Sequence, residues 1–482
     1  MRPATDRSGL ADAPNWGAAV WLPAIFTTLA ALVVYGLTLA PDLTWANHGV
    51  DGGELMTAVY TRGLPHPPGY PLYRLLGQIV VYLPFDPVAY RFNLFSAITV
   101  ALAAGVLTLA AARWPLPTAA RPLSAITAAA VGLTFAFSSL VWSQATITEV
   151  YGLALLLLAL FLWALLTKRP SLLTGFLLGL SLTAHPTGWF MLPLALAQTP
   201  RAGWPRLLLG GLVGLLPLVL LPWLAHPASP VVWGEPTTLR GWWWLVSGQL
   251  YRGYAFALPL ADLPVRLAAW LPIWLSQFTW AGIPLIAAGV WLLPRPERQQ
   301  ALWLGGTAVL YLLFALAYLP DDAIILALPA WLLLSLLLAP TYHKLGILAL
   351  CLPLILLLVN FNEQNLRADK QPIRGRAEAL LAAIPPGAVV STPGDPTIFA
   401  LWYFQHVEGQ RPDVILVDEN LWAFDWYRAR LARLHPGLAG LEQPDAANFA
   451  ALNIEERPSC RASLNTHFTI PFNLTCAEEI DS

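Results

Sequence analysis

Residues 21–40 read WLPAIFTTLAALVVYGLTLA, a run of twenty residues without a charged side chain. A helix of about 20 apolar residues is long enough to cross the roughly 30 Å hydrocarbon core of a bilayer. The run is longer than the core of a typical signal peptide, and no obvious small-residue cleavage site follows it. The segment therefore predicts a first transmembrane helix that is retained in the protein.

Apolar runs of similar or shorter length recur through the first 360 residues and predict about eleven membrane crossings. They are expected near residues 21–40, 93–112, 123–142, 151–166, 171–184, 187–197, 207–224, 277–293, 302–319, 323–338 and 346–359. The two short runs on either side of His185 could instead form one broken helix. A single broken helix in place of two crossings would put every later loop on the opposite side of the membrane.

The composition agrees with a membrane protein. Of the 482 residues, 57% are hydrophobic and 11% are charged, whereas a soluble protein carries about 25% charged residues. The net charge is −1, so the chain lacks the excess of positive charge that is typical of nucleic-acid-binding proteins. The charges are uneven, since 26 of the 55 lie after residue 360. We predict a polytopic membrane domain over residues 1–360 and a water-soluble domain over residues 361–482.

Lysine and arginine residues predict the sidedness, because short cytoplasmic loops are enriched in positive charge. With Arg2 and Arg7 inside and eleven crossings, every predicted inner loop is basic. The basic residues of those loops are Arg113, Arg121, Lys168, Arg169, Arg201, Arg206, Arg295, Arg298 and Lys344. We therefore expect a multi-pass cell-membrane protein with a cytoplasmic N-terminus and an extracytoplasmic C-terminal domain.

The first outer loop, at about residues 41–92, is far longer than a simple connector. Asp51 and Glu54 are three residues apart and would share one face of a helix that begins between them. A carboxylate pair beside an apolar wall can supply a general base. Four prolines in residues 65–71 fix an extended path around His66. The alternatives are helix capping or solvated loop charge for the carboxylates, and a turn position for His66.

Several motifs carry a resemblance to a known family. They are Asp51-x-Gly-Glu54, His66-Pro-Pro-Gly-Tyr70-Pro-Leu72, Arg91-x-Asn93-x-x-Ser96, Glu149-Val-Tyr151, Trp233-Gly-Glu-Pro236, Gln249-x-Tyr-Arg252, Gly394-Asp395, Trp402-Tyr403 and Arg411-Pro-Asp413. Together they resemble the signature of a polytopic family related to protein O-mannosyltransferases, whose members carry the GT-C glycosyltransferase fold. The chain departs from that signature at Gly52, where a serine is common, and at His48, where the segment is usually more apolar.

The resemblance implies an all-α polytopic membrane protein with a GT-C-like fold and a small C-terminal α/β domain. In such enzymes the first outer loop carries a catalytic acidic residue, and the donor is usually a sugar on a polyprenyl phosphate. The resemblance therefore implies an inverting hexosyl- or pentosyltransferase with Asp51 as the first choice for the base and Glu54 as the second. Its acceptor would be a hydroxyl of a protein, glycan or lipid at the outer membrane face.

A lipid-phosphate donor needs cations near the membrane surface, because charge accumulates on the departing phosphate. Arg252 and Arg240 flank the three tryptophans at positions 242–244, and Arg252 is the preferred phosphate contact. An aromatic belt with arginines that reach lipid headgroups explains this pattern equally well. The other donor-binding candidates are Arg74, His66 and Tyr70, and the remaining site candidates are His48, Glu149, His185, Trp233 and Asp322.

Two of these candidates have simple structural explanations. A histidine at membrane depth is costly without a partner, so His185 is either a site residue or a satisfied residue at a helix end. Asp321 and Asp322 precede a helix, where capping is the preferred interpretation. The chain has no zinc pattern such as His-x-x-x-His or Cys-x-x-Cys, but carboxylates from several outer loops could bind Mg²⁺ or Mn²⁺.

The C-terminal tail has a βαβ-like pattern. Strands are expected at residues 388–391 and 414–417, with a helix that starts at Asp395 between them and a second helix over residues 422–434. In an oxidising compartment Cys460 and Cys476 could form a disulfide.

Two other functions stay open. A transporter or flippase of a lipid-linked glycan would use the same basic and aromatic groups without a base. A non-catalytic scaffold for envelope assembly would need neither carboxylate. The sequence does not specify the sugar or the acceptor.

Overall fold

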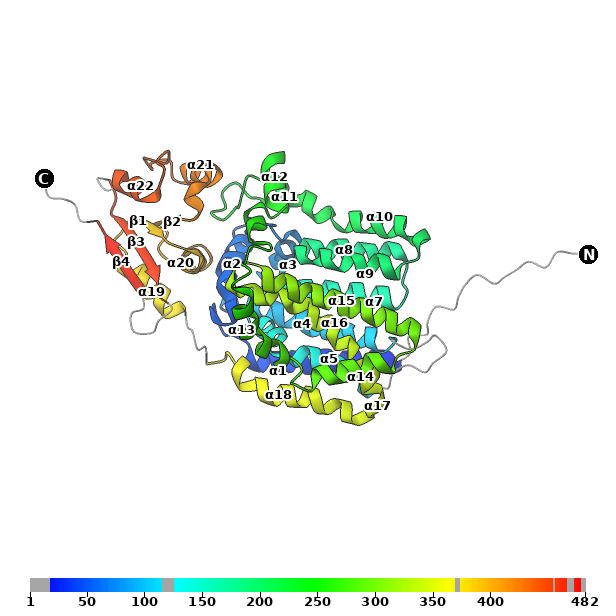
Figure 1. The fold of residues 1–482 in the computed structure, drawn as a ribbon. Coiled ribbons are helices and arrows are strands. Elements are labelled where there is room, and N and C mark those ends of the chain that lie inside the picture. Colours follow the sequence, from blue (N-terminus) through cyan, green and yellow to red (C-terminus); the bar gives the residue numbers. More distant parts are fainter. Residues whose placement is uncertain (1–17, 115–124, 369–372, 454–455, 466–471, 478–482) are drawn as a thin grey trace, which may run out of the picture.

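The computed structural model describes residues 18–114, 125–368, 373–453, 456–465 and 472–477. A bundle of helices occupies most of the chain, and a small sheet with its own helices lies at one end of that bundle (Figure 1). The membrane-type bundle and the C-terminal α/β region were both predicted from the sequence. The predicted domain boundary at residue 360 stays a prediction.

The centre of the bundle is formed by α1 (Ala18–Thr38), α4 (Val88–Ala111), α5 (Ala125–Phe137) and α7 (Tyr151–Leu166). Buried polar groups in this apolar environment need partners. The Tyr35 hydroxyl of α1 donates to the Ala136 carbonyl oxygen at 2.8 Å, and the Trp142 indole N–H donates to Thr38 Oγ1 at 2.9 Å. Trp142 lies in α6 (Ser139–Ala145), so these two bonds fix α1 against the bent pair of α5 and α6.

The backbones of α8 (Ser171–Ala184) and α10 (Trp204–Gly214) approach each other closely. A Cβ atom added at Gly175 would lie 1.8 Å from the Leu207 carbonyl oxygen, and one at Gly179 would lie 2.0 Å from that of Gly211. Small residues four apart allow such contact in membranes, where helix association depends on close packing. Glycine is therefore required at both positions.

Among the residues that the structure describes, five helical runs are long and apolar enough to cross a membrane: Val20–Thr38, Val88–Ala111, Arg201–Leu224, Arg295–Ala317 and Asp321–Gln364. The α5 and α6 pair, bent by 70°, would make a sixth, and four shorter apolar helices are α7, α8, α13 (Leu263–Ser276) and α14 (Gly282–Leu292). The protein is thus a multi-pass membrane protein. The count of eleven crossings and the sidedness stay predictions, and Arg2, Arg7 and Arg121 lie outside the described residues.

Some predicted spans have a different form in the structure. The expected span at 123–142 bends at Ser138, and the spans at 323–338 and 346–359 belong to one helical run of 44 residues. The remaining helices of the bundle are α9 (Leu192–Gln198), α11 (Leu221–Leu224), α12 (Leu239–Val246), α15 (Arg295–Ala317), α16 (Leu328–Leu337), α17 (Ala339–Leu345) and α18 (Cys351–Gln364).

The C-terminal region contains a four-stranded sheet with the order β2-β1-β3-β4. Its strands are β1 (Val389–Thr392), β2 (Ile415–Asp418), β3 (Ser459–Leu464) and β4 (Phe472–Cys476), and its helices are α19 (Arg374–Ala383), α20 (Asp395–Trp402), α21 (Asp425–Leu434) and α22 (Ala446–Asn453). β1 is parallel to β2 and β3, whereas β3 and β4 are antiparallel. The predicted strands and the helix start are confirmed to within one residue. The Cys460–Cys476 disulfide is also present, between β3 and β4.

The first long loop, residues 41–92, shares a hydrophobic core with the C-terminal sheet. Its helix α2 (Gly52–Tyr60) packs against α20, and the two helices lie between the bundle and the sheet in Figure 1. A Cβ atom at Gly53 would lie 2.4 Å from the Phe399 carbonyl oxygen of α20. We call the region where residues 41–92 meet residues 373–453 the junction. Because its two halves share one core, neither half is expected to keep its shape alone.

Candidate functional site

The two carboxylates proposed as a base lie on either side of the His66 imidazole. Glu54, in the first turn of α2, is fully buried, and both of its oxygens are used by His66. One oxygen lies 2.7 Å from His66 Nδ1, and the other accepts the His66 backbone N–H at 2.7 Å. Asp51 precedes α2 and lies 3.8 Å from His66 Nε2, with 41% of its side chain exposed. Asp51 is therefore accessible, whereas both oxygens of Glu54 are hydrogen-bonded to His66.

The pKa values of His66 and Asp51 are set by burial and by the charged groups around them. Burial lowers the pKa of His66, but the carboxylates of Glu54 and Asp51 outweigh it and raise the value to about 9. Burial raises the pKa of Asp51 to about 6 even though the His66 charge opposes the increase. Near pH 7 the site therefore holds an ionised Asp51 beside a protonated His66.

The proline-rich segment at residues 65–71 sets the orientation of His66. Tyr70 takes a left-handed backbone conformation, with φ of 39°, and directly precedes α3 (Pro71–Val80). This turn brings the Tyr70 hydroxyl to 3.1 Å from His66 Nε2. The imidazole is thus fixed at both nitrogens, by Glu54 and by Tyr70. We call Asp51, Glu54, His66 and Tyr70 the His66 cluster.

Glu149 contributes a third acidic group from the connection between α6 and α7. It is buried, and the charge of Asp51 adds to the effect of burial in raising its pKa. The α4 residues named in the family signature hold this connection in place. Ser96 Oγ accepts the Glu149 backbone N–H at 3.3 Å, and Asn93 Oδ1 accepts the Thr148 hydroxyl at 2.6 Å.

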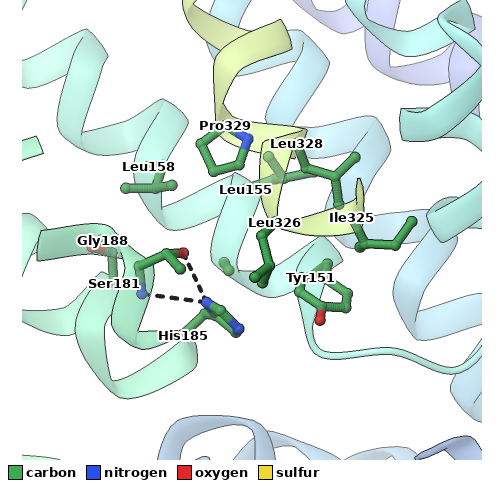
Figure 2. Close-up of a pocket in the computed structure, with 12 residues that line it drawn as sticks. Tyr151, Leu155, Leu158, Ser181, His185, Gly188, Ile325, Leu326, Leu328 and Pro329 are labelled. Carbon is green, nitrogen blue, oxygen red and sulfur yellow. Dashed lines mark hydrogen bonds between the residues drawn. The ribbon is translucent and has the colours of Figure 1, made fainter. Parts of the chain in front are cut away.

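His185 follows α8 and faces the same region. Its ring lies 5.2 Å from that of Tyr151 and stacks at 6.5 Å on that of Tyr70. Burial lowers the pKa of His185 to about 4, and the charge of His66 adds to this effect, so His185 is neutral where His66 is charged. Figure 2 shows His185 and Tyr151 in the wall of a pocket, with Ser181 and Gly188 beside His185. Apolar side chains of α7 and of residues 325–329 form other parts of the wall.

The loop of residues 225–262 closes the site from another side. Leu64 and Val232 form a parallel bridge, which carries the Trp233 ring to 6.1 Å from His66. Tyr251 lies 6.0 Å from His66 on the same loop. Trp233 also lies 6.1 Å from Trp426 of α21, so the C-terminal region completes the aromatic wall.

The three arginine candidates have different environments. Arg74 is buried, and its guanidinium donates to the carbonyl oxygens of Gly63 at 3.0 Å and Leu224 at 3.3 Å. Arg74 therefore has backbone partners that hold the first long loop to α11. Arg252 is exposed and adjoins Tyr251, and Arg240 is exposed in the first turn of α12. The Arg252 Nε–H donates to the Ser247 carbonyl oxygen at 3.3 Å, and its role as a phosphate contact stays a prediction.

The two other candidates lie near the edge of the site. His48 is exposed, with a left-handed backbone at φ 65°, in the turn before Asp51. Asp322 is exposed in the first turn of the helical segment Asp321–Ala327, and its charge raises the pKa of Asp51. Asp321 and Asp322 both lie in the first turn, where they complement the helix dipole as predicted, but Pro320 occupies the N-cap position and the predicted capping bond is absent. Within the described residues, no group of three or more His, Cys, Asp or Glu side chains is arranged to hold a metal ion.

Comparison with known proteins gives two family matches and related chains. The family "Protein O-mannosyl-transferase TMEM260 N-terminal domain" matches residues 51–199, and "TMEM260-associated domain 2" matches residues 373–435. The protein O-mannosyl-transferase TMEM260 of Mus musculus is 30% identical over 470 residues, with 86% of this chain and 65% of the relative covered. The corresponding protein of Dictyostelium discoideum is 25% identical over 248 residues, with 44% of this chain and 29% of the relative covered.

These matches make the chain similar to the TMEM260 protein O-mannosyl-transferases over residues 51–199 and 373–435. The matched residues 51–199 begin at Asp51 and include Glu54, His66, Glu149 and His185. The chain spans about two thirds of the length of the mouse relative and less than a third of that of the Dictyostelium relative.

The fold of this chain is also found among solved structures. The crystal structure of ArnT from Cupriavidus metallidurans bound to undecaprenyl phosphate aligns with a TM-score of 0.56 and 14% identity, over 92% of this chain and 93% of that one. The apo structure of the same protein aligns with a TM-score of 0.53 and 15% identity, over 91% of this chain and 92% of that one. At this identity the likeness establishes the fold.

Tyr151, Tyr251 and Trp426 are parts of the site that were not predicted from the sequence. Tyr151 and Tyr251 stand inside motifs that carried the family resemblance, Glu149-Val-Tyr151 and Gln249-x-Tyr-Arg252, so a signal was present. Trp426 had none, because its approach to Trp233 depends on how the C-terminal region docks on the bundle.

Proposed function

We propose that this chain is an inverting glycosyltransferase that moves a sugar from a polyprenyl phosphate to an acceptor hydroxyl at the outer face of the membrane. The observation that carries the proposal is the pairing of accessible Asp51 with a His66 whose charge is held by buried Glu54. The names of the curated relatives support mannose as the sugar and a protein hydroxyl as the acceptor. The ArnT structure bound to undecaprenyl phosphate supports a polyprenyl carrier.

Asp51 is the proposed base. Its carboxylate takes the proton of the acceptor hydroxyl as the hydroxyl oxygen forms a bond to the anomeric carbon. A pKa of about 6 keeps Asp51 ionised at neutral pH and still basic enough to accept a proton as that bond forms. General base catalysis of this kind contributes about 10² to 10⁴ in rate. A single displacement at the anomeric carbon inverts its configuration.

His66 is the proposed partner of the departing phosphate. As the bond from the anomeric carbon to the phosphate oxygen breaks, its electron pair and negative charge move to the phosphate. A protonated imidazole near that oxygen stabilises the developing charge. Glu54 is a positioning residue in this scheme, because it fixes the His66 ring and keeps it protonated. Arg252 supplies a second cation from the loop that carries Tyr251.

The test is a transfer assay on the purified full chain in detergent, with polyprenyl-phosphate mannose and a hydroxyl-bearing peptide. Release of prenyl phosphate and gain of a hexose by the peptide are both measured by mass. Asp51→Asn should lower transfer by about 10² to 10⁴ while the melting temperature stays near that of the wild type. Asp86→Asn is the matched control, because Asp86 is a 91% exposed aspartate of the same loop.

Wild-type activity in the Asp51→Asn variant would refute the assignment of the base. Movement of labelled lipid across reconstituted vesicles without transfer to the peptide would favour a flippase. If cells in which Asp51 and Glu54 are both replaced keep the wild-type phenotype, the protein would be a non-catalytic scaffold.

A further inference from the structure

A second pocket lies within the C-terminal region, and its described lining residues include none of the His66 cluster. Its walls come from the end of α20 and the turn after it, from β2 and from α21, with Pro230 contributed by the loop of residues 225–262. The polar side chains of the lining include His406, Arg430 and His435. Trp402 and Leu434 are among its apolar side chains. A ligand with a polar head and an apolar body would match both parts.

Arg430 of α21 is the charged group of this pocket. It is only 8% exposed, and its guanidinium donates to the Ser229 carbonyl oxygen at 2.9 Å. Its Nε–H is buried and has no hydrogen-bond partner among the described residues. A buried donor that loses its water without gaining an acceptor costs about 1 to 3 kcal/mol, and more when the group is charged. One N–H donor of this buried cation therefore lacks an acceptor.

His406 and His435 add N–H hydrogen-bond donors to the pocket but no charge. Burial lowers the pKa of His406 to about 4, with His435 contributing, and burial also lowers the pKa of His435, with Arg457 contributing. Both imidazoles are thus neutral at pH 7, and each keeps one N–H donor. None of the described lining residues is Asp or Glu. The lining therefore supplies no counter-charge to Arg430, although Glu235 outside the lining raises the pKa of Arg430 against the larger effect of burial.

We propose that this pocket binds the oxyanion of a small ligand, a phosphate or a carboxylate, with Arg430 as the charged contact and His406 and His435 as neutral donors. This site goes beyond the proposed sugar transfer, because none of its described lining residues belongs to the His66 cluster. Planar guanidinium groups bind both oxyanions through paired N–H donors. The bond from Arg430 to Ser229 also ties α21 to the loop that carries Trp233. An anion at Arg430 is thus expected to stabilise the docked C-terminal region.

Thermal unfolding of the purified full chain in detergent tests the proposal, with inorganic phosphate and acetate as probes at constant ionic strength. At least one probe should raise the wild-type melting temperature saturably, by about 2 °C or more. Arg430→Gln should abolish this response. Arg433→Gln is the matched control, because Arg433 is exposed on α21, is not among the lining residues and removes the same charge. Its response should equal that of the wild type.

A second variant covers the case in which Arg430→Gln does not fold. Leu434→Glu places a carboxylate in the pocket next to Arg430, so this variant should melt above the wild type without any probe and should no longer respond to phosphate or acetate. No response of the wild type to either probe would overturn the proposal. Equal responses in the wild type and in Arg430→Gln, or a full response in Leu434→Glu, would assign the effect to an adventitious ion only.

Discussion

The bundle and the junction are stabilised by different kinds of interaction. In the bundle, α8 and α10 are in backbone contact at Gly175 and Gly179, so the fit depends on the absence of side chains. In the junction, charged groups are paired across long sequence distances. Arg374 of α19 bonds to Asp42 of the first long loop and to Glu408, and its guanidinium lies 5.1 Å from the Phe404 ring. Changes in the bundle should therefore act on stability, whereas changes in the junction can separate activity from stability.

Glu54→Gln should have the largest effect of the changes that test this comparison. It leaves His66 without its buried partner, and removal of one member of a buried ion pair costs about 3 to 5 kcal/mol of unfolding free energy. We expect loss of transfer together with a lower denaturation midpoint, whereas Asp51→Asn should lose transfer alone. Glu442→Gln, at an exposed glutamate, is the control for both measurements. Equal stabilities of Glu54→Gln and the wild type would show that the pair does not stabilise the junction.

Gly179→Ala tests the packing of the bundle. The added Cβ would lie 2.0 Å from the Gly211 carbonyl oxygen, so α8 and α10 must separate. Overpacking of this kind costs about 1 to 3 kcal/mol, and thermal unfolding in detergent would measure it. Gly306→Ala in α15 is the matched control, because its added Cβ meets nothing within 4 Å and alanine favours the helix. If both variants had the same melting temperature, close approach of α8 and α10 would not be needed.

The dependence of kcat/KM on pH should be bell-shaped. Asp51 must be ionised to act as the base, so activity should fall tenfold per pH unit below its pKa of about 6. His66 must be protonated to stabilise the phosphate, so activity should fall above its pKa of about 9. The high pKa of His66 also stabilises the fold below pH 6.5, and this contribution should disappear as pH rises through 9. A profile without an acidic limb would contradict the role of Asp51.

Arg374→Gln should have the smallest effect. One third of the Arg374 side chain is exposed, so solvent screening limits its ion pairs to about 1 kcal/mol or less of unfolding free energy. Because these pairs tie the C-terminal region to the first long loop, we expect a modest decrease in transfer at low salt. The decrease relative to the wild type should shrink as salt rises, because salt screens the wild-type pairs. Arg461→Gln is the control, since its pair with Glu419 lies within the C-terminal region. Equal activity of the two variants at all salt concentrations would exclude a role for Arg374 in docking.

Much of the local structure could be predicted from the sequence. β1 and β2 lie within one residue of their predicted positions, and α2 begins between Asp51 and Glu54 as expected, whereas β3 and β4 were not predicted. Hydropathy did not predict the 70° bend at Ser138, because the two helices together are apolar enough to pass as a single span. Hydropathy also could not reveal that Arg74 donates hydrogen bonds to backbone carbonyl oxygens, since those oxygens belong to residues 63 and 224.

By itself, the sequence determined that this chain enters a membrane, which residues carry the family signature and that Asp51, Glu54 and His66 are candidates for chemistry. Those conclusions depend on local composition and spacing. Only the tertiary structure decided which carboxylate is accessible, because burial and partners depend on contacts with distant segments. Trp233 and Tyr251 reach His66 from a loop more than 150 residues away, and Asp42 meets Arg374 across 332 positions. These contacts leave the Asp51 carboxylate accessible and bury the Glu54 carboxylate completely.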